Sequence, residues 1–474
     1  MKILFCFWSQ FDDIEGRGGG VRLYMENTIK ELVGRGHDVY TLSSGISYSL
    51  SQKCYIRKIG KNKSIKKFDV VNSPMMSPSH FSFYNQRTYL NDQSLKGALF
   101  KFIERQGGFD IIHFHGLEGY TLESLAIKEK FPQTRLFLSI HNYHAFCPQV
   151  NLWYQERKKC ENYEEGLNCI NCLKTDHNTE HITYAYMLSN YLKNLNINPK
   201  SGLYKLFYLM SRAFYFVFRR KRKVDNKITN EFDYKQFSMF RNSNVNYINK
   251  YVDKVFPVSN RAAEICEGFG IEKNLLKTLY IGTKFADNQQ FESSSKIQDD
   301  SFRIAYIGYM RRDKGFYFLL TELEKLNKSI SSRIELVFAS KVNDGKILSR
   351  IKRLLKKFRA VDFYDGYTHE NLNEILRGVH LGIVPVLWED NLPQVAFEFK
   401  GLGIPVLASE YGGASELSKS EHFTFSVTKK GDFRDKLRAI MDQPSLINDY
   451  WEKGIPLKTN QEHVDKLVEL YESA

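Results

Sequence analysis

The densest group of residues that could do chemistry lies at positions 388–398, where the sequence reads WEDNLPQVAFE. A short apolar run just upstream predicts a buried strand, and the helix predicted after it begins at about Pro393. Asp390 and Asn391 therefore precede a helix N-terminus, where backbone N–H groups and the helix dipole favour an anion. Glu398 lies about one and a half turns into that helix. Two carboxylates at such a strand end suit binding of sugar and ribose hydroxyl groups; the alternative is a capped, solvent-exposed helix.

These residues belong to a chain in which short apolar runs alternate with helix-like segments. Lys2–Trp8 is fit for a buried strand, a glycine-rich loop follows at 15–20, and residues 21–33 carry apolar side chains at helical spacing. This strand–helix–strand order predicts a parallel sheet with helices packed on it, and the order restarts in the second half of the chain. Further strands are predicted at 37–42, 110–115, 135–141, 253–258, 302–307, 333–338, 361–364, 381–385 and 405–408, and further helices at 260–268, 314–326 and 460–472.

The restart of this order divides the chain into two α/β domains. We predict a first domain over residues 1–285 and a second over 295–455, with a polar, serine-rich join between them. Residues 456–474 are predicted to form a terminal helix. Residues from about 146 to 250, where spaced cysteines precede a basic and aromatic tract, interrupt the pattern, and we interpret them as an insertion in the first domain.

Composition excludes several classes of protein. The 474 residues are 42% hydrophobic, which is ample for packed cores and excludes wholesale disorder. The sequence has no apolar run long enough to span a bilayer, and its first residues lack the apolar stretch of a signal peptide, so we expect a cytoplasmic protein. The net charge of +14 is compatible with nucleotides, phospholipids or nucleic acids as partners without selecting one of them.

The acidic segment carries a resemblance to a known family. Asp390–Glu398 resembles the Glu-x7-Glu signature of family 4 glycosyltransferases, and other segments match that family in the same order. The matching segments are Gly19-Gly20 before a helix, Gly36–Val39, Asp110–His115, Ser139–Asn142, Val258-Ser259, Tyr280–Thr283, Gly308–Gly315 and Phe363–Gly366. The resemblance implies an α/β protein with the GT-B fold, in which two Rossmann-like domains face each other across a cleft. It also implies that the terminal helix crosses back to the first domain.

The resemblance assigns roles to individual residues. The family's first acid, which contacts the donor sugar, falls on Asp390, because Glu389 is one residue out of register; the second acid, which contacts the ribose, falls on Glu398. His141, at a predicted strand end, is implied to face the donor sugar, although a histidine there is otherwise a routine polar residue. The donor-binding residues implied in addition are Gly19, Gly20, Lys314, Asn391, Leu392 and Pro393.

The sequence departs from the family where the donor's phosphates are expected. Tyr309 occupies the place of a phosphate-binding arginine, while Lys314 matches the family lysine. Since a diphosphate is best neutralised by more than one cation, Arg311 or Arg312 is predicted to supply the missing charge. The alternative for these two arginines is a solvated surface pair.

The function implied is transfer of a sugar from a nucleotide-diphosphate sugar, with retention of configuration, to a saccharide or lipid-linked glycan acceptor in surface polysaccharide assembly. Negative charge develops on the departing diphosphate, and helix N-termini, Lys314 and the Gly19-Gly20 amides are expected to stabilise it. No catalytic cofactor is expected. The family works without a catalytic metal, and the sequence contains no Asp-x-Asp pair, which argues against a metal-dependent GT-A enzyme.

Four of the seven cysteines, Cys147, Cys160, Cys169 and Cys172, fall at the start of the insertion. Four thiolates that include a C-x2-C pair match a structural zinc site in ligand number, although the other spacings are irregular. Free or partly oxidised thiols are the alternative, and His144 could substitute as a ligand.

The insertion continues with a tract at Lys205–Lys223 that contains seven basic residues, six aromatic residues and no acid. This tract is too short to span a bilayer but could lie on an anionic surface at the inner face of the membrane. The alternative is an amphipathic helix that covers its own domain and ends in a solvated basic segment. A nucleic-acid site is disfavoured, because no nucleic-acid-binding fold surrounds the tract.

Two other functions compete with glycosyl transfer. A nicotinamide oxidoreductase is also an α/β enzyme, but the glycines at 16–20 lie about eight residues after the first strand and lack the G-x-G-x-x-G order. The second competitor is a GT-B-like binding or scaffolding subunit without turnover. Tyr309 and Asp390 are the departures from the family that favour it.

Overall fold

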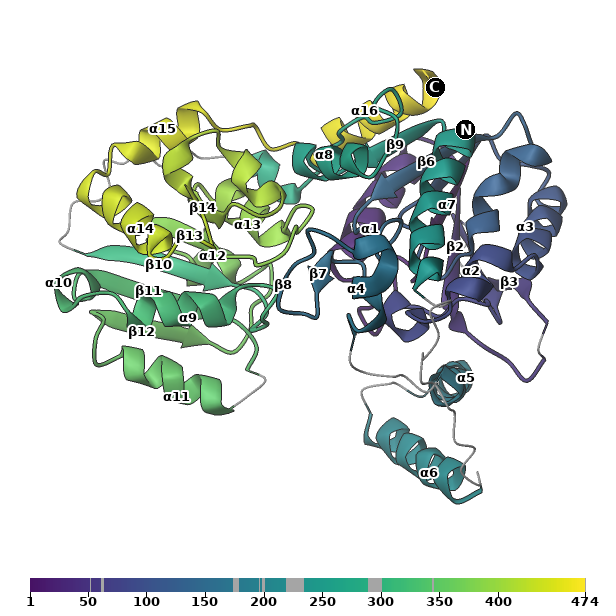
Figure 1. Cartoon of the computed structure of the whole chain (residues 1–474), viewed down its shortest axis with the longest axis horizontal. Coiled ribbons are helices and arrows are strands. Elements are labelled where there is room, and N and C mark those ends of the chain that lie inside the picture. The colour runs from purple at the N-terminus through teal and green to yellow at the C-terminus, as the bar shows by residue number, and fades with distance from the viewer. Residues whose placement is uncertain are drawn as a thin grey trace.

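The computed structural model of the chain describes residues 1–51, 53–60, 64–173, 179–195, 197, 201–218, 234–288, 301–342 and 345–473. Figure 1 shows two α/β domains side by side, each built around a sheet with helices packed on it. All neighbouring strands in both large sheets are parallel, except for one antiparallel pair at an edge. The predicted fold class, two Rossmann-like domains, is therefore confirmed.

The first domain contains a seven-stranded sheet in the order β3-β4-β2-β1-β5-β6-β9. Its strands are β1 (Lys2–Phe7), β2 (Asp38–Ser47), β3 (Tyr55–Ile59), β4 (Ile65–Val71), β5 (Ile111–Phe114), β6 (Arg135–Ile140) and β9 (Lys254–Pro257). The central strands are buried on both faces, which is why they are nearly continuous apolar runs in the sequence. The edge strand β3 and its neighbour β4 contain lysine and arginine among their apolar residues, and the sequence did not predict them.

Helices cover this sheet, and one of them, α7, is formed by the last part of the stretch 146–250. The helices are α1 (Gly19–Gly34), α2 (Gln86–Asn91), α3 (Ser94–Arg105), α7 (Lys235–Tyr251) and α8 (Asn260–Gly268), with short 3-10 turns η1 (Ser79–Ser82), η2 (Leu122–Glu129) and η4 (Lys284–Asn288). The helix α8 begins where the Ser259 hydroxyl accepts a hydrogen bond from the backbone N–H of Ala262 at 3.1 Å, a typical N-cap. The helix α7 packs against η2 and α2, so the last part of the stretch 146–250 belongs to the outer layer of the first domain.

The remainder of that stretch forms small elements outside the sheet. They are the hairpin of β7 (Trp153–Tyr154) and β8 (Lys158–Lys159), the turn η3 (Glu164–Gly166), and the helices α4 (Leu167–Ile170), α5 (Thr179–Asn194) and α6 (Gly202–Phe218). In Figure 1 the β7–β8 hairpin lies between the two domains, whereas α5 and α6 project away from the body of the first domain.

The second domain contains a six-stranded parallel sheet in the order β12-β11-β10-β13-β14-β15. Its strands are β10 (Phe302–Ile307), β11 (Ile334–Ala339), β12 (Ala360–Tyr364), β13 (Leu381–Val384), β14 (Val406–Ser409) and β15 (Thr424–Phe425). Its helices are α9 (Phe316–Glu324), α10 (Lys328–Ser331), α11 (Gly345–Leu354), α12 (Leu372–Ile375), α13 (Gln394–Gly401), α14 (Asp432–Asp442) and α15 (Leu446–Glu452), with 3-10 turns η6 (Gly413–Leu417) and η7 (Glu421–Phe423).

The terminal helix α16 (Asn460–Ser473) follows the second domain but packs on α1 of the first. Its His463 Nε2 lies 3.0 Å from the Tyr24 hydroxyl, and its Val464 and Leu467 are fully buried. A single buried hydrophobic cluster therefore runs from the first sheet to the core of the second domain. The chain thus returns from the second domain to the first, where this helix buries its apolar face.

Candidate active site

A cavity of about 790 Å³ lies between the two domains. Its second-domain wall includes residues at the carboxyl ends of three parallel strands: Gly308 after β10, Ser340 after β11 and Pro385 after β13. In α/β sheets ligands bind outside the carboxyl ends of the strands, so this is the position expected for a binding site. The first-domain wall includes the glycine-rich loop before α1 and His141 after β6.

Nine of the ten residues that the sequence proposed for catalysis or donor binding line this cavity. They are Gly19, Gly20, His141, Lys314, Asp390, Asn391, Leu392, Pro393 and Glu398. Arg311 is the exception. Its side chain is 59% exposed, its Nε donates to Asp313 Oδ1 at 2.9 Å, and it lines a different hollow beside Trp153 and Arg157. The geometry therefore gives Arg311 no part in this cavity.

Lys314 and Asp390 form an ion pair in the wall of the cavity. The Lys314 Nζ lies 2.5 Å from Asp390 Oδ2, and the Asp390 side chain is only 10% exposed. The same Nζ lies 5.4 Å from the centre of the Trp388 ring, which adds a cation–π contact. The loop that holds Asp390 packs on Gly412, where a Cβ atom would lie 2.0 Å from the Asp390 carbonyl oxygen, so a glycine is required there. The cation is thus held in the cavity by a rigid loop.

Glu398 is held by two side chains that the sequence did not indicate. The Tyr367 hydroxyl donates to Glu398 Oε2 at 2.9 Å, and His369 Nε2 lies 3.1 Å from Oε1. Burial and the neighbouring carboxylate of Glu398 raise the pKa of Tyr367 well above its usual value, so it is a donor at neutral pH. Each carboxylate oxygen still has acceptor capacity for a ligand hydroxyl. Both partners lie about thirty residues before Glu398, and no local pattern connects them to it.

Three cationic side chains line the cavity, at Arg22, Lys314 and Lys341. Tyr309, at the place where the resemblance expects a phosphate-binding arginine, also lines it and is 64% exposed. Arg22 already pairs with Glu26 at 3.3 Å, whereas Lys341 is exposed. Lys341 follows the end of β11 by two residues, so the rule that ligands gather at strand ends would have identified it.

The glycine-rich loop brings backbone rather than side chains to the cavity. The Gln394 Nε2 donates to the Gly20 carbonyl at 2.9 Å, and a Cβ on Gly20 would lie 2.8 Å from the Gln394 side chain. A glycine at this position therefore lets α13 and the first turn of α1 approach each other across the cavity. The free N–H groups at the start of the sixteen-residue α1 face the same space and favour an anion there.

His141 is a neutral imidazole in the first-domain wall. Its Nε2 lies 3.2 Å from His115 Nδ1, and the centres of the His141 and Tyr24 rings are 5.0 Å apart. Burial, with a smaller effect of His463, lowers the pKa of His141 to about 3. At neutral pH this side chain can exchange hydrogen bonds with a sugar hydroxyl but carries no charge. His113 and His115 are fully buried.

A buried carboxylate closes the seam between the domains beside the cavity. Glu389 is 1% exposed and accepts from Arg261 Nη2 at 2.7 Å, Lys159 Nζ at 2.8 Å and the Gly412 backbone N–H at 3.0 Å. Burial acts to raise the pKa of Glu389, but the hydrogen bonds from Arg261 and Lys159 outweigh it and lower the pKa. Lys159 comes from the β7–β8 hairpin and Arg261 from α8, so both first-domain cations hold a second-domain acid. No local pattern in the sequence predicts this contact.

The cysteines of the insertion are free thiols, and three of the four are buried. Burial raises the pKa of Cys160 to about 11 and that of Cys172 to about 12. Within the part of the chain that the structure describes, no group of three or more His, Cys, Asp or Glu side chains is arranged to hold a metal ion. Arg241 is 3% exposed and donates to Cys169 Sγ at 3.3 Å, but burial outweighs this contact and raises the pKa of Cys169. The zinc site stays a prediction, which metal analysis of the purified protein would test.

Comparison with known proteins agrees with this geometry. The profile of the family described as "Glycosyl transferases group 1" matches residues 287–455, which include the second domain. A curated relative, the "uncharacterized glycosyltransferase MJ1607" of Methanocaldococcus jannaschii, is 22% identical over 167 residues. That match covers 33% of this chain and 42% of the relative, so it spans less than half of either protein. The second domain is thus similar in sequence to glycosyltransferases.

Solved structures resemble the whole chain. Sucrose-phosphate synthase from Thermosynechococcus elongatus has a TM-score of 0.56 at 12% identity and covers 100% of this chain and 99% of its own. The Anabaena Alr3699/HepE structure in complex with UDP and glucose has a TM-score of 0.54 at 14% identity, with 100% of both chains covered. At such low identity these likenesses show the fold alone. The fold is the one that the sequence predicted, two Rossmann-like domains in the GT-B arrangement.

Proposed function

We propose that this protein is a glycosyltransferase that moves a sugar from a nucleotide-diphosphate sugar to a saccharide or lipid-linked glycan. The observation that carries the proposal is the meeting of Lys314, Asp390 and Glu398 with the glycine-rich loop and His141 in one interdomain cavity. The profile match over the second domain supports it. Retention of configuration, a reaction without a catalytic metal, and a place in surface polysaccharide assembly are parts of the same proposal, and they rest on the resemblance of the sequence.

In this proposal the second domain binds the nucleotide part of the donor. Glu398 accepts hydrogen bonds from the ribose hydroxyls, while Tyr367 and His369 fix the orientation of its carboxylate. Lys314 binds the diphosphate, and Lys341 takes the role of second cation that the sequence analysis gave to Arg311 or Arg312. The diphosphate then competes with Asp390 for Lys314. Because a bound diphosphate carries more charge than one carboxylate, the competition favours the donor.

The reaction breaks the bond between the sugar's anomeric carbon and the diphosphate oxygen, and the electron pair leaves with the diphosphate. The acceptor hydroxyl forms the new bond to that carbon and gives up its proton to the departing phosphate group. Lys314 and the N–H groups at the start of α1 stabilise the charge that develops on the leaving group. Asp390 and neutral His141 hold hydroxyls of the sugar, so the anomeric carbon faces the acceptor.

The test is binding and turnover with defined nucleotides and no added metal. Uridine diphosphate is the first probe, because the Anabaena structure with the same fold is in complex with UDP. We expect UDP, or another nucleoside diphosphate in a panel, to raise the unfolding temperature, since a ligand at a hundred times its Kd adds about 2.7 kcal/mol of stability. The matching sugar nucleotide should then be hydrolysed slowly in the absence of acceptor. A protein that binds none of the panel contradicts the proposal.

A binding subunit without turnover is the second candidate, and Tyr309 favours it. This side chain lies in the cavity where the family has a phosphate-binding arginine, so one charge for the leaving group is absent from that position. Binding of a sugar nucleotide without release of the nucleoside diphosphate, with any acceptor offered, would select this candidate. Release of the diphosphate excludes it.

A further inference from the structure

The helix α6 presents an apolar face to solvent. Four large apolar side chains follow one another at positions i, i+3, i+4 and i+7 of one helical face, and each is at least 43% exposed: Leu203, Leu206, Phe207 and Met210. Tyr204 and Tyr208, which lie on the other side of the helix, are less exposed, and α6 packs against α5. A surface helix usually turns its polar face to solvent. In α6 the apolar face is exposed instead, and its burial against a partner would be favourable.

The exposed apolar surface is concentrated at this place in the molecule. Fifteen large hydrophobic side chains are exposed in the described residues, and seven of them lie between Tyr191 and Met210. Besides the four on the apolar face of α6, they are Tyr191, Leu195 and Leu209. A contiguous apolar patch of this kind marks an interaction site for a protein or a membrane.

Charge selects between these partners. Positions 202–224 contain no acidic residue, and α6 itself exposes Lys205. The sequence that follows α6 reads Arg219-Arg220-Lys221-Arg222-Lys223, which lies outside the described residues. An exposed apolar face on a helix that carries a lysine, in a stretch of sequence rich in basic residues and without an acid, fits the surface of an anionic bilayer. Across the described part of the chain, no helix has both the length and the apolar character needed to pass through a bilayer.

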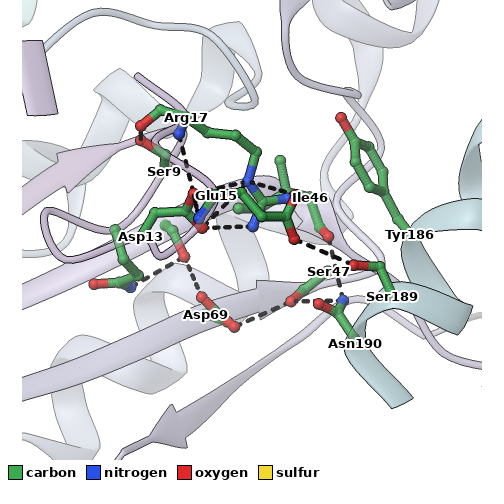
Figure 2. A network of polar contacts seen from close by, with 12 residues as sticks. Ser9, Asp13, Glu15, Arg17, Ile46, Ser47, Asp69, Tyr186, Ser189 and Asn190 are labelled. Atoms are coloured by element: carbon green, nitrogen blue, oxygen red, sulfur yellow. Dashed lines mark hydrogen bonds and ion pairs between the residues drawn. The ribbon is translucent and has the colours of Figure 1, made fainter. Parts of the chain in front are cut away.

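The hairpin of α5 and α6 is connected to the cavity. Figure 2 shows the contact: Asn190 Nδ2 on α5 donates to the Ile46 carbonyl at 3.3 Å, and Ser189 Oγ donates to Glu15 Oε1 at 3.4 Å. Glu15 belongs to the loop whose Arg17 pairs with Asp13 at 2.6 Å, and Gly16 of that loop lines the cavity. The helix α5, against which α6 packs, is thus anchored beside the glycine-rich wall of the cavity.

We propose that the α5–α6 hairpin docks this protein on an anionic phospholipid bilayer and brings the first-domain side of the cavity to the lipid surface. The acceptor is then a lipid-linked saccharide that enters the cavity from the membrane. The docking stands on the surface of α6 alone, whereas the assignment of the acceptor rests on the proposed glycosyl transfer.

Vesicle flotation tests the docking. Wild-type protein should float with vesicles that contain phosphatidylglycerol, float poorly with vesicles of phosphatidylcholine alone, and be released by high salt, which screens the charges. The triple variant Leu206→Ser, Phe207→Ser, Met210→Ser should lose binding by about tenfold or more, because the apolar face supplies the insertion. The control carries the same kind of change at equally exposed sites elsewhere, Leu50→Ser, Met239→Ser and Leu355→Ser, and should float like the wild type.

Three results overturn the docking: wild type that does not float, a triple variant that floats like the wild type, or equal binding to neutral and anionic vesicles. Sedimentation equilibrium tests whether a second copy of the chain binds this face. A dimer that forms in the wild type but not in the triple variant would assign the face to that second copy. Binding of UDP separates the two proposals. Vesicle binding without nucleotide binding would support the docking and contradict the proposed glycosyl transfer. Nucleotide binding without vesicle binding would contradict the docking alone.

Discussion

The two walls of the interdomain cavity hold their functional groups in different ways. In the second domain the groups hold each other: Lys314 pairs with Asp390, and Glu398 is oriented by Tyr367 and His369. The first domain offers the Gly20 backbone and His141, and its wall is fixed by contacts across the seam. Asn391 Nδ2, for example, donates to the Ile140 carbonyl, next to His141, at 3.0 Å.

This difference indicates a division of labour between the walls. The second domain has its charges in place before the domains meet, so it should bind a nucleoside diphosphate largely by itself. The first wall is positioned against the second domain by contacts across the seam, so sugar transfer should depend on contacts such as those of Glu389. Changes in the second wall should therefore affect nucleotide binding and transfer together, whereas changes at the seam should separate them.

Glu398→Ala should have the largest effect. The change removes the carboxylate proposed to bind the ribose and leaves Tyr367 and His369 without their partner. We expect kcat/KM for release of the nucleoside diphosphate to fall about a hundredfold or more, the scale of a charged hydrogen bond and its stranded partners. The exposed Glu374→Ala is the control. Wild-type turnover in Glu398→Ala would contradict the assignment of the second wall.

Lys314→Ala should weaken nucleotide binding next in order. A hydrogen bond to a charged group contributes about 1.5–3 kcal/mol, so we expect Kd for UDP to rise roughly 10- to 150-fold in calorimetric titration. Lys352→Ala, an exposed lysine on α11 of the same domain, should leave Kd unchanged. An unaltered affinity in Lys314→Ala would place the essential cation elsewhere, with Lys341 the next side chain to change.

Glu389→Gln tests the seam. The substitution keeps the shape but removes the charge that Arg261 and Lys159 share, and we expect the free energy of unfolding to fall by about 1–3 kcal/mol in urea denaturation. Glu264→Gln breaks an exposed pair with the same Arg261 and should change stability by less than about 1 kcal/mol. We expect Glu389→Gln to retain its affinity for UDP while transfer slows. Equal loss of both would show that the two walls are not independent.

The titration of His141 should have no effect at neutral pH and should lower stability only in acid. Its folded pKa of about 3 lies below the ordinary value of 6.5, so the unfolded chain binds the extra proton first as the pH falls. Stability should therefore decrease from about pH 6.5 downward, and His141 should contribute about 1.4 kcal/mol per pH unit until its folded pKa is reached. His141→Asn should show a shallower decline than the wild type by that amount. Parallel stability curves would show that His141 is not buried in its neutral form.

The order of the elements was accessible from the sequence because it depends on local patterns. Buried parallel strands are apolar on both faces, so β1, β5, β10 and β13 appear as short apolar runs. The strand β4 was missed because Lys66 and Lys67, which are only partly buried next to the edge strand β3, interrupt its apolar run. The tract 205–223 was recognised as unusual, but the position of α5, which packs against α6, beside the glycine-rich loop depends on contacts between segments far apart in the sequence.

The candidate site could be predicted where one short segment supplies several groups. The segment 388–398 contains the strand end, the loop and the helix that bring Asp390 and Glu398 to the cavity. The second cation for the diphosphate could not be chosen from the sequence. Arg311 and Lys341 both lie near strand ends, and only the direction of their side chains distinguishes them. In the structure Arg311 bonds Asp313 and faces away, while Lys341 faces the cavity.

The sequence by itself determined two α/β halves, the glycine-rich loop before the first helix, and the acids before and within α13. These features could be predicted because apolar periodicity and turn residues act over a few positions. Only the tertiary structure decided which groups hold them in place. Tyr367 meets Glu398, and Arg261 and Lys159 meet Glu389, across intervals of about 30 to 230 residues. Such pairs form because a buried carboxylate must find donors wherever the fold brings them, and that requirement leaves no period in the sequence.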